Sequence, residues 1–483
     1  MRSSILVHLA VVSASLATPV QKRDSVTAQV NFSNNTGDPQ HLASGLLYGV
    51  PDTLDQIPST FYTDIGYNYE RAGGAQIPAP GRGWIWGLTE YEVRFISSSF
   101  KSGHILIPIK NRFASALSNY KTAREYGANF IFLIHDLWGA DGTQNSSASY
   151  PGDDGDWTSW DDYLTRLFSD MKSNSMTDAL IVDIWNEPDG SAFWNREQSQ
   201  YLEMWGRTYY KFRDEFGSDV LLSGPASAGE PLSSNTWWEA WASFVASNDS
   251  IPDQYAWHME GGSGDLLSSH AGLAYWLSTY DLPQKTININ EYAVFDEQVP
   301  SGSAWWISQL ERIDAYGLRG NWLSGYQLHD FMSSLLSKPN ADTSEYSATG
   351  TGYFPNGDYQ VYKYYYQNMT GYRVGTVPST DLKLDAYATV GDDGYARVLV
   401  GVRITEGTWE LQLNGLSSLG LATSGTLNVH TWGFPVNSDD AHYGEVDAPT
   451  DLGWYDHAYS DDTVTFPVYQ TDTTTAYAFE FAI

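Results

Sequence analysis

The chain has 483 residues, of which 42% are hydrophobic, so it is long enough for one large and one small domain. Its formal net charge of −32 argues against nucleic acid and anionic membranes as partners, because both need basic patches. The absence of cysteine excludes a disulfide framework, thiolate chemistry and a cysteine-ligated metal site.

Residues 1–23 have the pattern of a signal peptide followed by a dibasic propeptide site. A positive start is followed by a short apolar run, small residues, and then Lys22 and Arg23. The apolar run is too short to span a bilayer, and no later segment is long enough. We therefore expect a secreted, extracellular protein with no membrane partner. N-glycans are expected at the sequons of Asn31, Asn34, Asn145, Asn248 and Asn368.

Residues 46–370 alternate short apolar strands with amphipathic helical patterns. The expected helices include 160–173, 196–216, 235–246 and 303–316, with a last one at 359–368. Eight repeats of this alternation predict an α/β fold, a (β/α)8 TIM barrel with a parallel sheet. The expected strands are 46–50, 67–71, 130–135, 179–185, 220–223, 255–258, 286–290 and 318–326.

The segments on either side of the barrel have a different sequence pattern. From residue 371 to 483 only alternating strands remain, separated by Gly, Asp, Asn and Ser, which predicts a small antiparallel β-sandwich. Residues 24–45 form an extended segment whose alternating part could join that sandwich. Within the barrel, 75–103 is a Gly/Pro-rich insertion that carries Trp84 and Trp86. It could close a cleft into a pocket or extend it.

Two glutamates follow predicted barrel strands. In "ALIVDIWNEPDG", Glu187 comes after the fourth strand, and in "KTININEYA", Glu291 ends the seventh. Since the functional groups of such barrels lie at the carboxyl ends of the strands, we expect the two side chains to face each other. Pro188 is expected to restrict Glu187 to an extended backbone. The alternative is that each glutamate is a solvated loop carboxylate or a helix cap.

Two facing carboxyl groups suit the hydrolysis of a glycosidic bond. One carboxyl must be protonated to donate to the leaving oxygen, and the other must be ionised. We expect the charge of one to raise the pKa of the other, which would help to divide these roles. The aromatic content of 15% fits either a large core or rings that line a sugar-binding cleft.

These motifs resemble glycoside hydrolase clan A. "WNEPD" after a fourth strand and "NINEYA" ending a seventh are the residues that carry the resemblance, and family 39 is the most similar family. A barrel followed by a β-sandwich is similar to family 39 as well. The resemblance implies a retaining double displacement. Glu187 would be the general acid/base, Glu291 the nucleophile, and Asn186 the amide that binds the sugar 2-hydroxyl.

Six further residues are candidates for substrate contacts. His258 in "YAWHME" resembles a clan position near the nucleophile, and Arg71 at the second strand could hydrogen-bond the nucleophile or form a structural salt bridge. His135 and Asp136 end the third strand and could contact sugar hydroxyls. Trp322 and Tyr326, on the eighth predicted strand, could form a stacking floor.

No metal or other cofactor is expected. The histidines show no spacing typical of a metal site, and "DDGD" at 153–156 lacks the other ligands of a calcium loop. The sequence therefore predicts a secreted retaining glycosidase acting on plant or microbial oligo- or polysaccharide, with xyloside- or arabinoside-type exo action favoured. The alternatives are another clan A hydrolase, either an endo-glycanase or a glucuronidase-type enzyme, and a non-catalytic carbohydrate-binding barrel.

Overall fold

A computed structural model describes residues 26–77, 82–91, 94–98, 105–109, 112–341 and 343–483. The predicted signal and propeptide segment, 1–23, lies outside these residues. In the part of the chain that the structure describes, no helix is long and apolar enough to cross a membrane.

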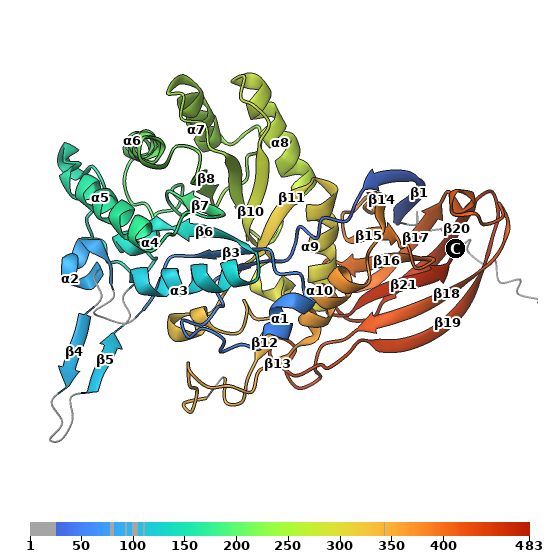
Figure 1. Ribbon diagram of the computed structural model, residues 1–483. Helices are drawn as coiled ribbons and strands as arrows, with labels where there is room; N and C mark the ends of the chain where they lie inside the picture. The colour runs from blue at the N-terminus through green and yellow to red at the C-terminus, as the bar shows by residue number, and fades with distance from the viewer. Residues whose placement is uncertain (1–25, 78–81, 92–93, 99–104, 110–111, 342) are drawn as a thin grey trace, which may run out of the picture.

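Eight parallel strands close into a barrel, which confirms the predicted fold class (Figure 1). Helices follow most of these strands along the chain and surround the barrel. The strands are β2 (Gly45–Leu47), β3 (Tyr69–Ala72), β6 (Asn129–Leu133), β7 (Leu180–Asp183), β8 (Leu221–Ser227), β9 (Gln254–Met259), β10 (Thr286–Tyr292) and β11 (Ala315–Arg319). The helices are α1 (Ser59–Asp64), α2 (Leu88–Tyr91), α3 (Arg112–Glu125), α4 (Ile134–Trp138), α5 (Thr158–Ser173), α6 (Gln198–Phe216), α7 (Thr236–Ser247), α8 (Leu266–Thr279), α9 (Pro300–Arg312) and α10 (Gly357–Gln367).

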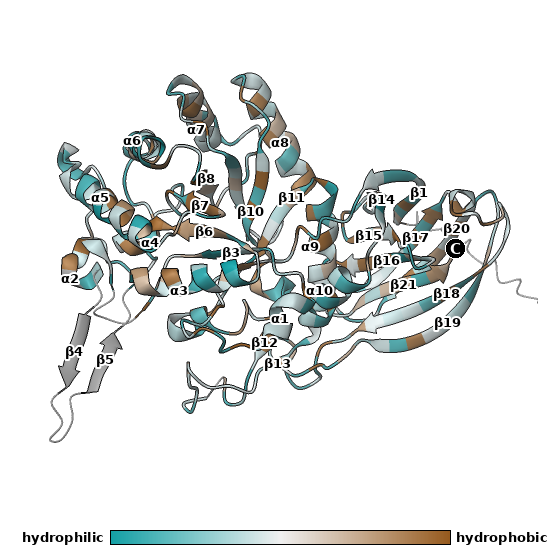
Figure 2. Cartoon of the chain, in the orientation of Figure 1, coloured by the Kyte–Doolittle hydropathy of each residue, from teal (hydrophilic) through white to brown (hydrophobic). Residues whose placement is uncertain are grey.

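Alternation along each strand divides its residues between two environments. On β7, Leu180 and Val182 belong to the large core between the strands and the surrounding helices. Ile181 points the other way and packs in a small apolar cluster inside the barrel with Tyr69, Ile131 and Leu318. The helices carry hydrophilic and hydrophobic residues side by side, as Figure 2 shows, because only one face of each is covered.

Two of the sequence predictions for the barrel are wrong. The eighth strand ends at Arg319 and not at 326, because Asn321 turns the chain away and donates hydrogen bonds to the backbone oxygens of Leu47 and Leu328. The helix expected at 303–316 ends at Arg312, and the strand begins three residues later. Helix α3 was not predicted, since its buried face includes polar residues and lacks a clear apolar stripe.

The second domain is one nine-stranded sheet, mostly antiparallel, in the order β19-β18-β21-β16-β15-β14-β1-β17-β20. Its two end strands, β19 and β20, contact each other, so the sheet curls around its own apolar core. The prediction of an antiparallel sandwich is correct in kind, but β1 and β17 pair in parallel. The strands are β1 (Thr27–Gly37), β14 (Tyr372–Val377), β15 (Leu384–Val390), β16 (Tyr395–Val402), β17 (Gly407–Asn414), β18 (Gly425–Phe434), β19 (Thr450–Tyr459), β20 (Thr463–Gln470) and β21 (Ala476–Ala482).

Helix α9 joins the two domains. It packs against β15, β16 and β21 on one side and β11 on the other, and nearly all of its residues are buried. Arg312 donates to Asp385 of the sheet at 2.8 Å, and Arg403 of the sheet donates to Glu297 at 2.6 Å. Buried ion pairs of this kind fix the relative position of the two domains.

The insertion at 75–103 is described in part. Trp84 and Trp86 lie in a short 3-10 helix, Trp84–Trp86. Strands β4 (Arg94–Ser98) and β5 (Ile105–Ile109) form an antiparallel hairpin that projects from the body of the molecule below α2 (Figure 1). Residues 78–81, 92–93 and 99–104 lie outside the described part. Two short strands, β12 (Leu336–Ser337) and β13 (Phe354–Pro355), form a separate pair.

Candidate active site

A cavity of about 470 Å³ opens at the carboxyl ends of the barrel strands. This is an ordinary volume for a small-molecule site. Its walls come from the ends of the eight barrel strands and the segments that follow them, so residues far apart in the chain meet there. Most of the predicted site residues line it: His135, Asp136, Asn186, Glu187, His258, Glu291 and Trp322.

Arg71 lies beneath the cavity and connects two of its lining side chains, Glu291 and Asn186, with Asp183. The guanidinium is fully buried, and it donates to Asp183 at 2.7 Å, to Glu291 at 2.5 Å and to Asn186 at 2.7 Å. Arg71 sits two residues after Tyr69 on β3, and Asp183 two residues after Ile181 on β7. Alternation therefore places a polar layer directly above the apolar layer inside the barrel. Of the two predicted roles, Arg71 has both, since it is a salt-bridge partner and a donor to Glu291.

A β-bulge directs Glu291 into the site. In a regular strand Asn290 and Glu291 would point to opposite faces. The pairing of β10 with β9 shifts between Ile289 and Glu291, so that Glu291 lies opposite His258. Both side chains then point inward: Asn290 donates to Asp183 at 2.6 Å, while Glu291 accepts from Arg71. Bulges that re-aim side chains are frequent beside active sites.

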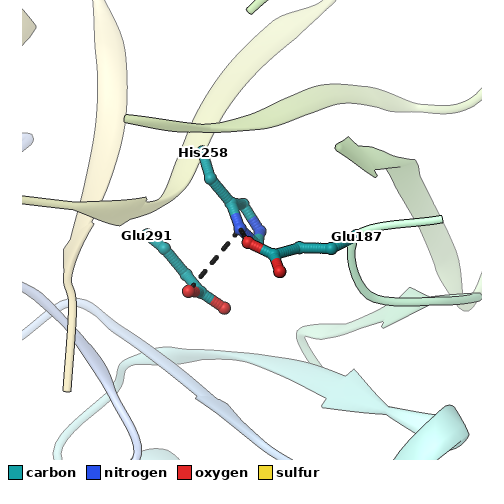
Figure 3. A group of neighbouring side chains, drawn as sticks. All are labelled: Glu187, His258 and Glu291. Atoms are coloured by element: carbon teal, nitrogen blue, oxygen red, sulfur yellow. Dashed lines mark hydrogen bonds and ion pairs between the residues drawn. The ribbon is translucent and has the colours of Figure 1, made fainter. Parts of the chain in front are cut away.

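His258 lies between the two glutamates (Figure 3). Its Nδ1 is 2.9 Å from Glu187 Oε1 and 3.5 Å from Glu291 Oε2. One carboxylate oxygen of each glutamate and the imidazole nitrogen all lie within 4.8 Å of one another. The expectation that the two glutamates face each other across the barrel mouth agrees with this geometry, which is close to the separation that retaining glycosidases use.

The backbone of Glu187 differs from the prediction. Its φ is +41°, in the left-handed region, although Pro188 was expected to hold it extended. A left-handed residue other than glycine costs roughly 1–2 kcal/mol. Here the Glu187 amide donates to the backbone oxygen of Ala226 at 2.8 Å, and its carboxylate accepts from His258. These bonds hold the strained residue in place, and strain of this kind is typical of functional sites.

The charge state of Glu187 also differs from the prediction. Burial acts to raise its pKa, but the hydrogen bond and charge of His258, with Arg71 and His135, outweigh burial and lower the pKa below its usual value. Burial acts to lower the pKa of His258, and the charges of Glu291 and Glu187 raise it instead. These opposite shifts favour the charged pair, with the proton on His258 and the negative charge on Glu187. The expected upward shift by a neighbouring anion is wrong for Glu187, because the cations beside it have the larger effect.

Asn186 and His135 have polar atoms available in the cavity wall. The Asn186 Oδ1 accepts from Arg71, which leaves its amide nitrogen to face a ligand. His135 follows β6, and its Nε2 lies 3.1 Å from Asp136 Oδ1. Its buried Nδ1 has no hydrogen-bond partner among the described residues. Buried polar atoms normally have a partner, so this nitrogen is available for a substrate hydroxyl.

Asp136 is held more tightly than expected for a substrate contact. Tyr48 donates its hydroxyl to Asp136, and the same hydroxyl accepts from the amides of Gly73 and Ala75 at 2.9 and 3.0 Å. The backbone oxygen of Asp136 accepts from Arg112 at 2.6 Å. Asp136 therefore shapes the wall of the cavity and orients His135.

Trp322 and Tyr326 are separated by the structure. Trp322 is 45% exposed, lines the cavity and is fixed by its indole nitrogen, which donates to the backbone oxygen of Ala293 at 3.2 Å. Tyr326 is 56% exposed and is not among the residues that line the cavity. Since β11 ends before either residue, the two rings do not share one strand face.

Several residues of the site were missed by the sequence analysis. Glu260 comes directly after β9 and places a third glutamate in the cavity wall. Glu291 was identified because functional groups of such barrels lie at the carboxyl ends of the strands. The same reasoning would have found Glu260, which lies two residues beyond His258. The other missed lining residues include Gln76, Asp141, Phe193 and Asn321, which lie in loops where no periodic signal exists.

Close carboxylate and imidazole groups can also bind metal ions. Among the described residues, Glu187, His258 and Glu291 are the one group with such spacing. However, the guanidinium of Arg71 already contacts Glu291, and it supplies the positive charge that a metal would otherwise provide. We therefore assign this cluster to acid–base and nucleophilic chemistry.

No family model matches the chain, and no curated protein matches it by sequence. Its fold is shared with solved structures. N2152 from Neocallimastix frontalis is 19% identical, with a TM-score of 0.71, over 94% of this chain and 99% of that one. A GH39 β-xylosidase from Caulobacter crescentus (11%, TM-score 0.54) and a GH30 endoxylanase from Clostridium papyrosolvens (15%, TM-score 0.53) each match 95% of this chain and all of their own length. The chain therefore has the barrel-and-sheet fold of glycoside hydrolases from families 39 and 30.

Proposed function

We propose that the protein is a retaining glycoside hydrolase. The observation that carries this proposal is the meeting of Glu187 and Glu291 in one cavity, with carboxylate oxygens within 4.8 Å and His258 between them. A nucleophile and an acid must reach the same glycosidic bond from opposite sides, and this spacing permits it.

In the first step the Glu291 carboxylate attacks the anomeric carbon. A bond forms between that carbon and the glutamate oxygen, and the bond to the glycosidic oxygen breaks. Glu187 gives its proton to the departing oxygen, so the leaving group is released as an alcohol. Arg71 holds Glu291 at the distance and angle needed for attack.

In the second step a water molecule attacks the anomeric carbon from the side of Glu187. Glu187 takes the water proton, the ester bond to Glu291 breaks, and both glutamates return to their starting states. Two inversions at one carbon leave the sugar with its original anomeric configuration. The amide nitrogen of Asn186 would bind the sugar 2-hydroxyl throughout.

The first step needs a proton on Glu187, and in the free protein that proton lies on His258. Their hydrogen bond of 2.9 Å is the path for its transfer. A bound sugar displaces water from the cavity, which disfavours the charged pair and moves the proton to Glu187. His258 thus acts as the proton reservoir of the acid.

The charges of the cavity favour a neutral sugar. None of the described residues that line it is lysine or arginine, whereas five of them are Asp or Glu. A uronic acid would place its carboxylate beside these groups at a high electrostatic cost. We therefore favour xyloside- or arabinoside-type substrates of plant or microbial origin over a glucuronidase-type activity.

A second cavity favours action on oligosaccharides longer than a disaccharide. It has a volume of about 190 Å³, includes Arg82, Trp86 and Gln144, and shares Asp141 with the main cavity. The insertion at 75–103 thus supplies a wall on which a further sugar ring could stack. Endo action or a long leaving group is the second candidate, to be tested with substrates of increasing length.

We further propose that the protein is secreted, on the basis of the signal-like sequence at 1–23. Of the five sequons, Asn31, Asn34, Asn145 and Asn368 are exposed. Asn248 is half-buried and donates to Ser250 at 3.1 Å, so it is the least suited to carry a glycan.

The decisive experiment incubates purified protein with a panel of nitrophenyl glycosides and plant polysaccharides, and follows the product anomer by NMR. We expect hydrolysis of at least one neutral pentoside, with the anomeric configuration of the substrate in the first product. Inverted product would disprove the double displacement. Binding of sugars without turnover of any member of the panel would favour a non-catalytic barrel.

A further inference from the structure

Glu260 is a third carboxyl group in the active-site cavity, and it takes no part in the two chemical steps described above. It follows directly after Met259, the last residue of β9, and lines the cavity with Glu187 and Glu291. Its carboxyl group lies beside that of Glu291, within reach of a hydrogen bond between the two side chains. This inference rests on the proposed function, because it concerns the residue assigned as the nucleophile.

The molecule has a dedicated space for this side chain. Gly320 lies just after β11, and a Cβ atom added there would collide with Glu260 Oε1. The backbone at Gly320 is fixed in turn, since its amide donates to the oxygen of Tyr292 at 2.9 Å and its oxygen accepts from Gln298 at 2.6 Å. Glu260 is thus held between β11 and Glu291.

A hydrogen bond between two carboxyl groups requires that one of them carries a proton. Glu291 accepts from the guanidinium of Arg71 and faces His258, so its negative charge is compensated. We propose that Glu260 is a positioning residue, a neutral carboxylic acid that donates a hydrogen bond to Glu291 and fixes the orientation of the attacking oxygen.

The surroundings of Glu260 are consistent with a neutral acid. The charged groups that face it are Glu291 on β10, Glu187 after β7, Arg71 on β3 and His258 on β9. Burial, then the charge of Glu291 and the bond to it, raise the pKa of Glu260 well above its usual value. Ionisation of Glu260 would place a second anion beside the nucleophile and break the bond between them.

The test compares the wild type with Glu260→Gln, which keeps a donor, and Glu260→Ala, which removes it. The substrate is a dinitrophenyl glycoside of the preferred sugar, because this leaving group needs no proton from Glu187. Any fall of kcat/KM at high pH then reports a group other than the acid. Glu230→Gln is the matched control, since burial raises the pKa of Glu230 to about 7 while the residue lies outside the cavity lining.

We expect the wild type and Glu230→Gln to lose kcat/KM about tenfold per pH unit above the ionisation of Glu260. Glu260→Gln should remain flat in that range and stay within about fivefold of the wild-type maximum, whereas Glu260→Ala should lose at least tenfold in kcat at every pH with little change in KM. An unchanged alkaline fall in Glu260→Gln, or equal activity of the Gln and Ala variants, would overturn the inference.

A second measurement is independent of activity. The unfolded chain releases the Glu260 proton above pH 4.5, whereas the folded chain retains it, so this group lowers stability as pH rises from 4.5. Glu260→Gln should therefore gain in Tm over the wild type at pH 8 but not at pH 4. A gain that is the same at both pH values would contradict a proton on Glu260. If the wild type cleaves no glycoside, the proposed function fails, while this Tm comparison still decides the state of Glu260.

Discussion

The mouth of the barrel and the core of the nine-stranded sheet are both built from buried strand residues, yet they use opposite chemistry. The sheet core is apolar throughout, with residues such as Val398, Leu411 and Phe481. The polar layer at the barrel mouth buries Arg71 and Asp183 completely. Burial of a charged group lowers the free energy of unfolding unless the group is paired. We therefore infer that the charged layer at the barrel mouth is kept for its chemistry and not for stability.

The two regions also differ in where their non-glycine residues with positive φ lie. In the sheet domain, the described non-glycine residues with positive φ lie in the connections between strands, for example Leu382 and Asp461. In the barrel, Tyr48, Glu187 and Ala293 have positive φ just after strands that lead into the cavity. Left-handed residues serve turns in both regions, and beside the cavity they also aim side chains.

The largest contrast is expected from removal of single carboxylates. Glu291→Gln should lower kcat/KM on every substrate by on the order of 10⁴-fold or more, because no other group can form the ester. Glu187→Gln should lose about 10²–10⁴-fold on natural glycosides, with the first step spared on activated aryl glycosides. Steady-state and burst kinetics measure both effects. Glu406→Gln, an exposed site in the sheet domain, is the control and should match the wild type.

Equal losses of stability should have unequal effects on activity. Arg71→Met leaves Asp183 and Glu291 without their buried partner and should cost about 3–5 kcal/mol. Leu411→Ala in the sheet core should cost about 2–5 kcal/mol through its cavity. Denaturant unfolding measures both. We expect the folded Arg71→Met protein to lose at least 10²-fold in kcat and the Leu411→Ala protein to keep it; similar kcat values would remove the distinction between the regions.

The pH dependence of stability should report the pair of His258 and Glu187. The raised pKa of His258 gives a contribution that is full below 6.5 and is lost as pH rises through its folded value. The lowered pKa of Glu187 gives one that is present above 4.5 and is lost as pH falls through its folded value. The wild type should therefore gain most over Glu187→Gln between pH 4.5 and 6.5 in Tm measurements. A constant difference across pH would show that the pair is uncharged.

The smallest effect is expected from the two exposed rings near the mouth. Trp322→Ala should raise KM about fivefold, because a stacked ring contributes about 1 kcal/mol, with little change in kcat. Tyr326→Ala should leave KM unchanged, since Tyr326 does not line the cavity. If Tyr326→Ala raises KM and Trp322→Ala does not, the sugar binds on a different face of the loop.

The order of strands and the two strand-end glutamates could be predicted from the sequence, because alternation and strand spacing depend on local periodicity. The backbone geometry that aims these side chains could not be predicted. The bulge before Glu291 and the left-handed backbone of Glu187 arise from pairing with β9 and β8, which no local pattern records. Glu260 shows the opposite case, since its position directly after β9 is a signal that the sequence does contain.

Strand β1 lies between β14 and β17, although the whole barrel separates it from them in the chain. During synthesis this strand therefore emerges from the ribosome long before either of its neighbours exists. The nascent protein must keep the partly apolar strand β1 unpaired in solution while the barrel assembles. Expression of residues 371–483 alone would leave the sheet without its bridging strand, so the two domains cannot be exchanged with those of other proteins as simple modules.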